Sequence, residues 1–584
     1  MDKEITGKAI DGEVLRRTMK YVRPFRLAFY STALITIILS FMAPVRTYLV
    51  KIAVDDKIQF GDVDGLQKII IVLVGLLIIH AGLQFLQSYM ANWLGQSVIL
   101  NIRRKLFSHV VSFKLKYFDN TPIGNLVTRV TSDIQTIAEI FSSGLLNIIS
   151  DILQLIMVLA FMFYINWKLT LVVLIPVPIL IVSTIVFKRA IKAAFIEIRK
   201  NVAKINTFVQ EHVTGMSVVQ IFNREREEMR RFRKVNTNHK NAWIKTVWAN
   251  AIFFPVVEIL SASSIALLVW WGAKGVISDH LQIGDIMAFI LFIHMIYRPI
   301  RQLADRFNTL QMGMVAANRV FNVLDTNQHI SDEGSNSSIE VQGGISFQNV
   351  WFGYKPENYV LKDVSFDVKK GETLALVGAT GAGKSSIINV LTKFYEIKKG
   401  SILVDGININ DFTLEHLRKV MAVVLQDVFL FDDTILNNIT LNNSSISKNK
   451  VIEGAKLIGV HDYIMGLDGG YSYQVRERGA VLSAGQRQLL AFLRAYVYDP
   501  QILILDEATS SVDTQSEQLI QRAIEKLTVG RTSIVIAHRI STIQKASKII
   551  VMDQGQKVEQ GTHKELLKVE GYYKRLFEYQ FTTN

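Results

Sequence analysis

With 584 residues, the chain is too long for a single compact domain, and a mean hydropathy of +0.25 is high for a protein that is soluble throughout. The absence of cysteine excludes disulfide frameworks, thiolate metal sites and cysteine nucleophiles. The formal net charge of +14 could indicate nucleic-acid binding, but Lys and Arg cluster beside apolar segments, which is typical of loops facing the cytoplasm. We therefore expect no nucleic-acid partner.

Six apolar segments, each near the length of about 20 residues that crosses a bilayer, occupy the first half of the chain. They lie at Leu27–Val50, Ile69–Met90, Leu145–Ile165, Leu169–Phe187, Ala251–Trp271 and Ile283–Tyr297. The long connections after the second and fourth segments are basic, whereas the first connection is acidic. This alternation predicts a multi-pass protein whose termini and long connections are cytoplasmic.

The connections between the apolar segments and the part of the chain after the sixth segment have patterns of their own. Apolar residues recur at helical spacing through Ile196–Phe222, so the long connections are expected to be helical extensions of the membrane segments. The polar stretch Asp325–Gly344 is typical of a linker, and strand–turn–helix alternation follows it. The sequence thus predicts an all-α transmembrane domain with six helices over residues 1–324, a linker over 325–344 and an α/β domain over 345–584.

The first functional motif of the α/β domain is a P-loop pattern. The strand-like run Leu374–Val377 leads into Gly-Ala-Thr-Gly-Ala-Gly-Lys-Ser at residues 378–385, followed by a helix. Backbone N–H groups of such a turn surround phosphates, and the helix dipole adds to the attraction. A flexible glycine turn is the alternative, which the flanking strand and helix disfavour. The predicted nucleotide-binding residues of this motif are Gly378, Thr380, Gly381, Ala382, Gly383, Lys384, Ser385 and Ser386.

Phosphate chemistry predicts the roles of two P-loop residues, and a second motif downstream supplies further residues for binding Mg²⁺ and for catalysis. Lys384 is expected to reach the β- and γ-phosphates of ATP, and the Ser385 hydroxyl to bind Mg²⁺. Downstream, the buried-strand pattern Ile502–Leu505 ends in two carboxylates. Asp506 is expected to hold the Mg²⁺ shell, and Glu507 to polarise the attacking water as a catalytic residue.

The segment Leu482–Gln488 resembles the signature sequence of the ABC ATPases, and it precedes the two carboxylates at the distance typical of that family. The other family motifs follow in order over Tyr354–His538. By resemblance, Tyr354 stacks on adenine and Gln426 contacts nucleotide and Mg²⁺. Asp513 marks the D-loop, and His538 is the second catalytic residue, which contacts the γ-phosphate. The resemblance makes the α/β domain a P-loop ABC ATPase domain that uses ATP and Mg²⁺.

In that family, the signature of one ATPase domain closes over ATP bound to the P-loop of another. The corresponding residues here are Ser483, Ala484, Gly485 and Gln486. One ATPase domain per chain therefore implies a half-transporter that pairs with a second half-transporter, in a homodimer or a heterodimer. Ala484 replaces the usual glycine, and we expect this to be tolerated unless the position needs a positive φ.

The transmembrane part resembles the exporter branch of the family. Residues from Phe118–Asp119 to Asp133 resemble its first cytoplasmic loop, and Glu211–Glu225 its second, which in exporters end in short coupling helices. The resemblance implies ATP-driven export of a hydrophobic or amphipathic cargo, of the multidrug or lipid class, across the cytoplasmic membrane by alternating access. An importer subunit, a soluble ABC ATPase, an ABC ATPase that gates or regulates, and a peptide exporter are the alternatives.

Polar residues inside membrane segments are costly and mark candidate cargo contacts. Asn147, Asp151 and Gln154 share one face of the third segment, where hydrogen bonding between helices is the favoured interpretation. Glu258 and His294, in the fifth and sixth segments, are the predicted cargo-contacting residues.

Overall fold

A computed structural model of the chain describes residues 12–278, 281–506, 514–537 and 539–581. The chain forms two compact units. The helical unit comprises residues 1–111 and 122–327, and the α/β unit comprises residues 112–121 and 328–584. A short piece of the first long connection thus belongs with the α/β unit. The domain limits predicted above, at 324 and 344, remain a prediction.

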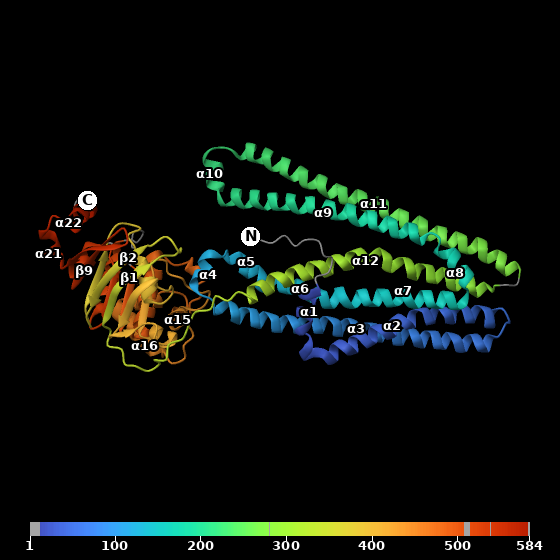
Figure 1. The fold of residues 1–584 in the computed structure, drawn as a ribbon, viewed down its shortest axis with the longest axis horizontal. Helices are drawn as coiled ribbons and strands as arrows, with labels where there is room; N and C mark the ends of the chain where they lie inside the picture. Colours follow the sequence, from blue (N-terminus) through green and yellow to red (C-terminus); the bar gives the residue numbers. More distant parts are fainter. Residues whose placement is uncertain (1–11, 279–280, 507–513, 538, 582–584) are drawn as a thin grey trace. The chain divides into compact units, whose positions relative to one another are not determined.

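Long helices joined by shorter ones form the helical unit (Figure 1). In chain order they are α1 (Gly12–Lys20), α2 (Arg26–Ile52), α3 (Val63–Val111), α5 (Ile123–Thr128), α6 (Ile134–Glu139), α7 (Leu146–Ile165), α8 (Trp167–Leu174), α9 (Val177–Thr214), α10 (Met216–Ile221), α11 (Glu225–Ile277) and α12 (Ile283–Leu324). Tighter or wider turns connect some of them, namely the 3₁₀ turn η1 (Arg23–Phe25) and the π-helical turns η2 (Ala53–Ile58), η3 (Arg129–Asp133) and η4 (Ile140–Leu145).

Six helical stretches among the described residues are long and apolar enough to cross a membrane, which confirms the six predicted segments. They are Arg23–Ile58, Val63–Val111, Leu146–Ile165, Trp167–Thr214, Glu225–Ile277 and Ile283–Ile300. Most of these stretches are much longer than a bilayer requires, because the long connections continue as helix. The fourth stretch divides into α8 and α9 at Pro176, since proline lacks the N–H that would continue the helix.

The third and fourth segments form a tight hairpin. Asn166 has an extended backbone and accepts a hydrogen bond from the N–H of Leu169 at 3.0 Å, so it caps the start of α8. The hairpin packs with α9, α11 and α12 around an apolar core that includes Leu169, Val257 and Phe289. Beyond the hairpin, α9 and α11 pack along each other and are joined through α10 (Figure 1).

The α/β unit contains two sheets. Its strands are β1 (Ile345–Phe352), β2 (Leu361–Val368), β3 (Thr373–Val377), β4 (Lys399–Val404), β5 (Ile407–Asn408), β6 (Met421–Val424), β7 (Ile502–Asp506), β8 (Thr532–Ile536), β9 (Lys548–Asp553) and β10 (Gln556–Gly561). The smaller sheet is antiparallel, in the order β2-β1-β4-β5. The larger has the order β10-β9-β3-β8-β7-β6 and is parallel except for β10.

Helices connect and cover these strands, as the alternating pattern predicted. They are α4 (Leu115–Asn120), α13 (Lys384–Leu391), α14 (Leu414–Lys419), α15 (Ile435–Thr440), α16 (Lys448–Ile458), α17 (His461–Met465), α18 (Ala484–Tyr498), α19 (Thr514–Thr528), α20 (Ile540–Lys545), α21 (His563–Lys568) and α22 (Tyr572–Phe581), with the 3₁₀ turns η5 (Gly470–Ser472) and η6 (Glu477–Gly479). The predicted fold class, six membrane helices followed by an α/β ATPase-type domain, is confirmed.

Alternate residues of β7 enter two different apolar cores. Ile502 and Ile504 pack into the core shared with the smaller sheet and α13, whereas Leu503 and Leu505 pack into the core beneath α18 and α19. All four are at most 1% exposed. A strand buried on both faces is typical of the centre of a parallel sheet, and it explains the unbroken apolar run in the sequence.

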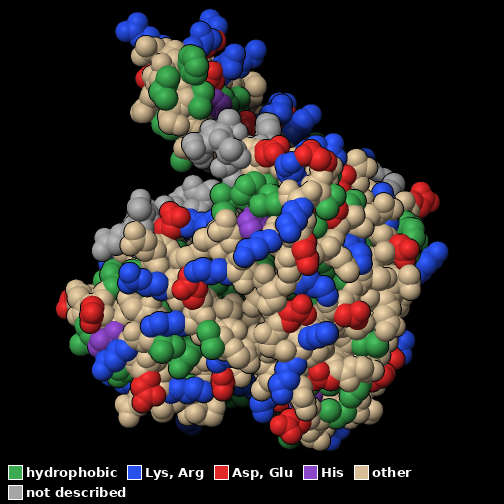
Figure 2. All heavy atoms as spheres, turned by 90° about the vertical axis from the view of Figure 1, so that its left-hand side faces the viewer, with side chains coloured by type: hydrophobic (Ala, Val, Ile, Leu, Met, Phe, Trp, Pro, Cys, Tyr) green, Lys and Arg blue, Asp and Glu red, His purple; other side chains and the backbone are tan. Residues whose placement is uncertain are grey.

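Figure 2 shows one face of the molecule, on which basic and acidic side chains are interspersed.

Candidate nucleotide-binding site

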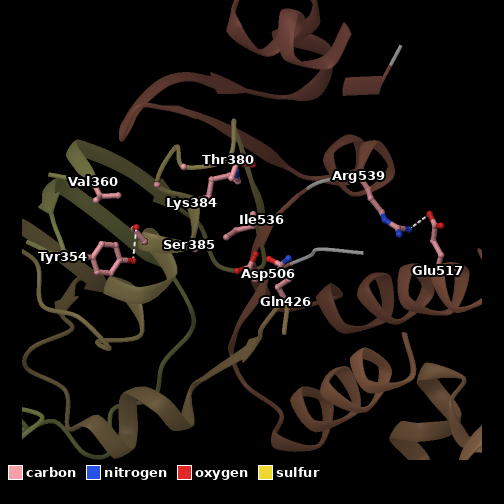
Figure 3. A pocket seen from close by; sticks show the side chains of 13 residues that line it. Tyr354, Val360, Thr380, Lys384, Ser385, Gln426, Asp506, Glu517, Ile536 and Arg539 are labelled. Atoms are coloured by element: carbon pink, nitrogen blue, oxygen red, sulfur yellow. Dashed lines mark hydrogen bonds and ion pairs between the residues drawn. The ribbon is translucent and has the colours of Figure 1, made fainter. Parts of the chain in front are cut away.

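A cavity of about 730 Å³ opens where β3, β7 and β8 end (Figure 3). Ligand sites in parallel α/β sheets lie at these carboxyl ends, and the volume is within the usual range for small-molecule sites. The cavity is lined by Tyr354, Val360, Thr380, Gly381, Gly383, Lys384, Ser385, Ser386, Gln426, Asp506, Glu517, Ile536 and Arg539. The fold therefore brings together predicted residues that lie as much as 152 positions apart in the sequence, from Tyr354 to Asp506.

The glycine-rich turn requires its glycines for two different reasons. A Cβ on Gly378 would lie 2.2 Å from the carbonyl oxygen of Met552 on β9, so the turn passes too close to the neighbouring strand for a side chain. Gly383 has a φ of 101° directly before α13 begins at Lys384, a left-handed conformation that glycine adopts freely. The turn therefore presents its backbone to the cavity at the N-terminus of a helix, a geometry that binds anions.

Lys384 is held inside the turn. Its ammonium is buried and donates to the carbonyl oxygens of Gly378, at 2.8 Å, and Ala379, at 3.0 Å. Burial lowers the pKa of Lys384, and the nearby carboxylate of Asp506 opposes that shift. A positive charge is thus kept in a partly dehydrated position beside the cavity, where a phosphate would offset its desolvation better than water does.

The oxygen donors at the cavity fit a magnesium ion that phosphates help to hold. Ser385, Gln426 and Asp506 all line the cavity, and they offer one hydroxyl, one amide and one carboxylate. Among the described residues, no group of three or more His, Cys, Asp or Glu is placed to bind a metal alone. Mg²⁺ typically uses one or two protein ligands together with substrate phosphates, so this donor set is suitable.

Tyr354 also lines the cavity, and contacts with neighbouring side chains hold its ring in place. Its hydroxyl is 3.2 Å from the hydroxyl of Ser386 and accepts a hydrogen bond from the side-chain amide of Asn389 at 3.0 Å. The ring meets Phe352 edge-on, with centroids 4.9 Å apart, and is 38% exposed. A fixed aromatic face open to the cavity is suited to stacking against a planar base.

The predicted signature residues lie at the start of α18, outside the lining of the cavity. Ser483 caps the helix: its hydroxyl accepts from the N–H of Gln486, and the Gln486 side chain accepts from the N–H of Ser483. Ala484 is the first helical residue, so the position does not need a positive φ in this structure. Gly485 is buried in the same first turn.

The lining also includes side chains that the sequence analysis did not single out. Arg539 and Glu517 form an ion pair at the far side of the cavity, and Val360 and Ile536 contribute apolar surface (Figure 3). Arg539 could have been noticed because it directly follows His538 in the sequence, whereas Glu517 carries no local signal. Three predicted residues, Glu507, Asp513 and His538, lie outside the described part of the chain.

The two predicted cargo-contacting residues belong to the helical unit and not to this cavity. Glu258 lies on α11 and His294 on α12, and both are exposed in the single chain. Asp151, predicted to bond between helices, has a carboxylate oxygen 3.7 Å from the Nε of Arg306 on α12.

Known protein families match both parts of the chain. Residues 30–300 match the family described as ABC transporter transmembrane region, and residues 361–510 match the family described as ABC transporter. The first covers the described membrane-spanning stretches almost completely, and the second contains the P-loop and β7.

Similar proteins extend over essentially the whole chain. The uncharacterized ABC transporter ATP-binding protein YknV of Bacillus subtilis is 36% identical over 583 residues, 99% of this chain and 96% of that protein. Bacillus subtilis YgaD, named "Putative multidrug export ATP-binding/permease protein", is 34% identical over 97% of this chain and 99% of its own length. A protein of the same description from Staphylococcus aureus is 34% identical over 97% of this chain and its full length. The chain therefore belongs to the ABC transporter family, as a half-transporter of the exporter type.

Proposed function

We propose that this chain exports a hydrophobic or amphipathic compound, of the multidrug or lipid class, across the cytoplasmic membrane at the expense of ATP. One observation carries the proposal: a phosphate-binding turn with a buried lysine, Lys384, and the carboxylate Asp506 line one cavity in the same chain as six membrane-spanning helices. The names of the similar proteins from B. subtilis and S. aureus support a multidrug cargo.

In this proposal, ATP occupies the cavity with its base on Tyr354 and its phosphates on the turn before α13. Bound Mg²⁺ would supply positive charge that stabilises the transferred phosphoryl group. Ser385, Gln426 and Asp506 hold that ion, Lys384 neutralises the phosphate oxygens, and Glu507 orients the attacking water, with His538 close to the γ-phosphate.

The transport cycle requires two chains. Ser483–Gln486 at the start of α18 contact the ATP held by a second half-transporter, so that nucleotide binding closes the two ATPase domains. Closure turns the cavity between the membrane helices outward, and hydrolysis resets it. Glu258 and His294 contact the cargo in that cavity, and the termini and ATPase domain are cytoplasmic.

The decisive test is ATP hydrolysis and transport by the full-length chain in lipid vesicles. Lys384→Ala and Glu507→Gln should each lower hydrolysis at least about 100-fold, because each removes a group that acts in the transition state. Lys450→Ala, an exposed lysine on α16, is the matched control and should hydrolyse ATP normally. Wild-type inside-out vesicles should accumulate a fluorescent lipid or a hydrophobic dye only with ATP and Mg²⁺. Hydrolysis without accumulation of any such compound would contradict export and favour a regulatory role.

A further inference from the structure

The α/β unit includes a piece of chain that comes from the first cytoplasmic connection, Ser112–Thr121, here called the docked segment. Several interactions fasten it. The Ser112 hydroxyl is 2.7 Å from Nδ1 of His329, and Phe113 pairs with His329 in a short antiparallel bridge. Lys114 forms an ion pair with Glu396 at 2.6 Å, and Phe113 is only 2% exposed. The docked segment is therefore part of this unit's packing and not a loose loop.

A further contact holds the docked segment at Tyr395, whose hydroxyl donates a hydrogen bond to the carboxylate of Asp119 in α4. Tyr395 is 9% exposed, and burial together with the Asp119 carboxylate raises the pKa of its phenol. The phenol thus stays protonated and remains the donor. A hydrogen bond to an ionised carboxylate is stronger than one between neutral groups.

The ring of the same tyrosine supports the candidate adenine site. Tyr395 meets Tyr354 edge-on, with centroids 5.0 Å apart and planes at 86°. The side chain of Asn389 on α13 donates to the Tyr354 hydroxyl, and its backbone carbonyl accepts from the N–H of Tyr395 at 3.2 Å. Tyr354 and Tyr395 are therefore held as one unit on the helix that follows the P-loop.

Tyr354 also stands between two cavities. One of its sides lines the nucleotide cavity of about 730 Å³. It also lines a smaller cavity of about 120 Å³, together with Lys114 and Leu115 of the docked segment and with Tyr395. Tyr354 therefore borders both the nucleotide cavity and the docked segment.

We propose that Tyr395 is a positioning residue that couples adenine, and not the phosphates, to the docked segment of the same chain: its ring holds Tyr354 and its hydroxyl holds Asp119. The coupling is reciprocal, so a docked segment favours base binding and a bound base favours docking. This inference rests on the proposed binding of ATP in the larger cavity. It assigns Tyr395 and Asp119, which line no part of that cavity, to its base subsite.

The test compares two ligands that share the phosphates but differ in the base. The full-length chain in lipid nanodiscs is titrated calorimetrically with the magnesium complexes of AMP-PNP, a non-hydrolysable ATP analogue, and of inorganic tripolyphosphate. Tyr395→Phe keeps the ring beside Tyr354 but removes the hydrogen bond to Asp119, so the docked segment no longer supports the base site. It should weaken AMP-PNP binding about five- to tenfold and leave tripolyphosphate binding unchanged. Asp119→Ala should do the same, the double variant should add nothing further, and Asp119→Asn, which keeps an acceptor, should retain most of the affinity.

Tyr471→Phe is the matched control, because it removes the hydroxyl of another buried tyrosine, bonded to His461 at 2.9 Å, in the same unit. Equal losses for both ligands, no loss for either, or additive effects of the two single variants would overturn the inference. Failure of the wild type to bind AMP-PNP would overturn the proposed function itself. A second readout is hydrogen exchange of the backbone amides of residues 112–121. AMP-PNP should slow this exchange in the wild type, whereas tripolyphosphate should not. In the Tyr395→Phe variant, AMP-PNP should not slow it either.

Discussion

Two elements, α2 of the helical unit and β7 of the α/β unit, bury different kinds of residue. In α2 of the helical unit, Thr32, Thr36 and Ser40 are buried, and each donates to the carbonyl oxygen four residues earlier. On the same helix, Leu34 is 58% exposed and Phe41 48%. In β7 of the α/β unit the buried residues are instead all aliphatic.

The difference follows from the solvent that each unit meets. Burying apolar surface stabilises a domain in water, but lipid tails solvate a leucine as well as another helix does. Packing between membrane helices therefore uses small and weakly polar residues, whose hydroxyls are satisfied within their own helix. One chain thus follows two sets of folding rules, and matched substitutions in the two units can test each rule.

The largest expected effect concerns glycine. Gly378→Ala forces a Cβ to within 2.2 Å of the Met552 carbonyl, which we expect to displace the turn at a cost of about 3–5 kcal/mol from overpacking and backbone strain. Nucleotide affinity should fall more than about 100-fold. Gly82→Ala in α3, where no atom lies within 4 Å, is the counterpart in the helical unit and should leave both stability and ATP hydrolysis intact. Calorimetric titration and thermal unfolding would check the pair, and a damaging Gly82→Ala would indicate that this surface contacts a partner chain.

A pair of highly exposed apolar residues tests the solvent difference directly. Ile78 in α3 is 68% exposed and Val529 in the α/β unit is 77% exposed. Ile78→Asp places a charge against lipid and should destabilise the protein by about 2.5–3.5 kcal/mol. Val529→Asp faces water and should change stability by no more than about 0.5 kcal/mol. Unfolding midpoints in lipid nanodiscs compare the two, and equal effects would refute the assignment of α3 to the bilayer.

Buried hydrogen-bonding side chains should also contribute different amounts of stability in the two units. Asn438 is 1% exposed and bonds both the N–H and the carbonyl of Phe431, at 2.8 and 2.9 Å, so Asn438→Ala should cost about 2–3 kcal/mol by leaving backbone groups unsatisfied. Ser264 in α11 bonds the Val173 carbonyl and the Tyr297 hydroxyl. Tyr297 keeps a bond to the Leu260 carbonyl, and hydrogen bonds between membrane helices average about 0.6 kcal/mol, so Ser264→Ala should cost about that much. Urea or thermal unfolding of the two variants measures the two losses of stability, and their ratio tests the difference.

The smallest expected effect concerns the water-facing end of the helical unit, where both units should obey the same rule. Arg17 of α1 forms a bidentate ion pair with Asp325, which ends α12, with both distances 2.5 Å. The hydrogen bonds from Arg17 hold the pKa of Asp325 below its ordinary value. A depressed carboxyl pKa contributes stability above the unfolded value of about 3.9 and loses it as the pH falls through the folded pKa.

Because both side chains are more than a third exposed, the contribution should be at most about 0.5 kcal/mol. Asp325→Asn should therefore lower the unfolding midpoint slightly at pH 7 and not at all near pH 3. A pH series of melting curves for the two proteins checks this, with high salt reducing the difference. An effect that persists at pH 3 would mean that Asp325 acts through packing rather than charge.

Much of this protein could be predicted from short stretches of sequence. A run of about 20 apolar residues must cross a bilayer or be buried, and a P-loop between a strand and a helix has few other uses, so the six helices, the α/β pattern and the lining residues Lys384, Ser385 and Asp506 followed from local pattern alone.

Only the tertiary structure showed which distant residues meet. Tyr395 and Asp119 lie 276 residues apart, and neither belongs to a motif that names the other. Glu517 reaches the cavity because α19 shares an apolar core with β7, and Ala484 needs no positive φ because α18 begins there. Sequence patterns report the period and chemistry of one element, whereas contacts between elements depend on how whole surfaces pack, which no short segment encodes by itself.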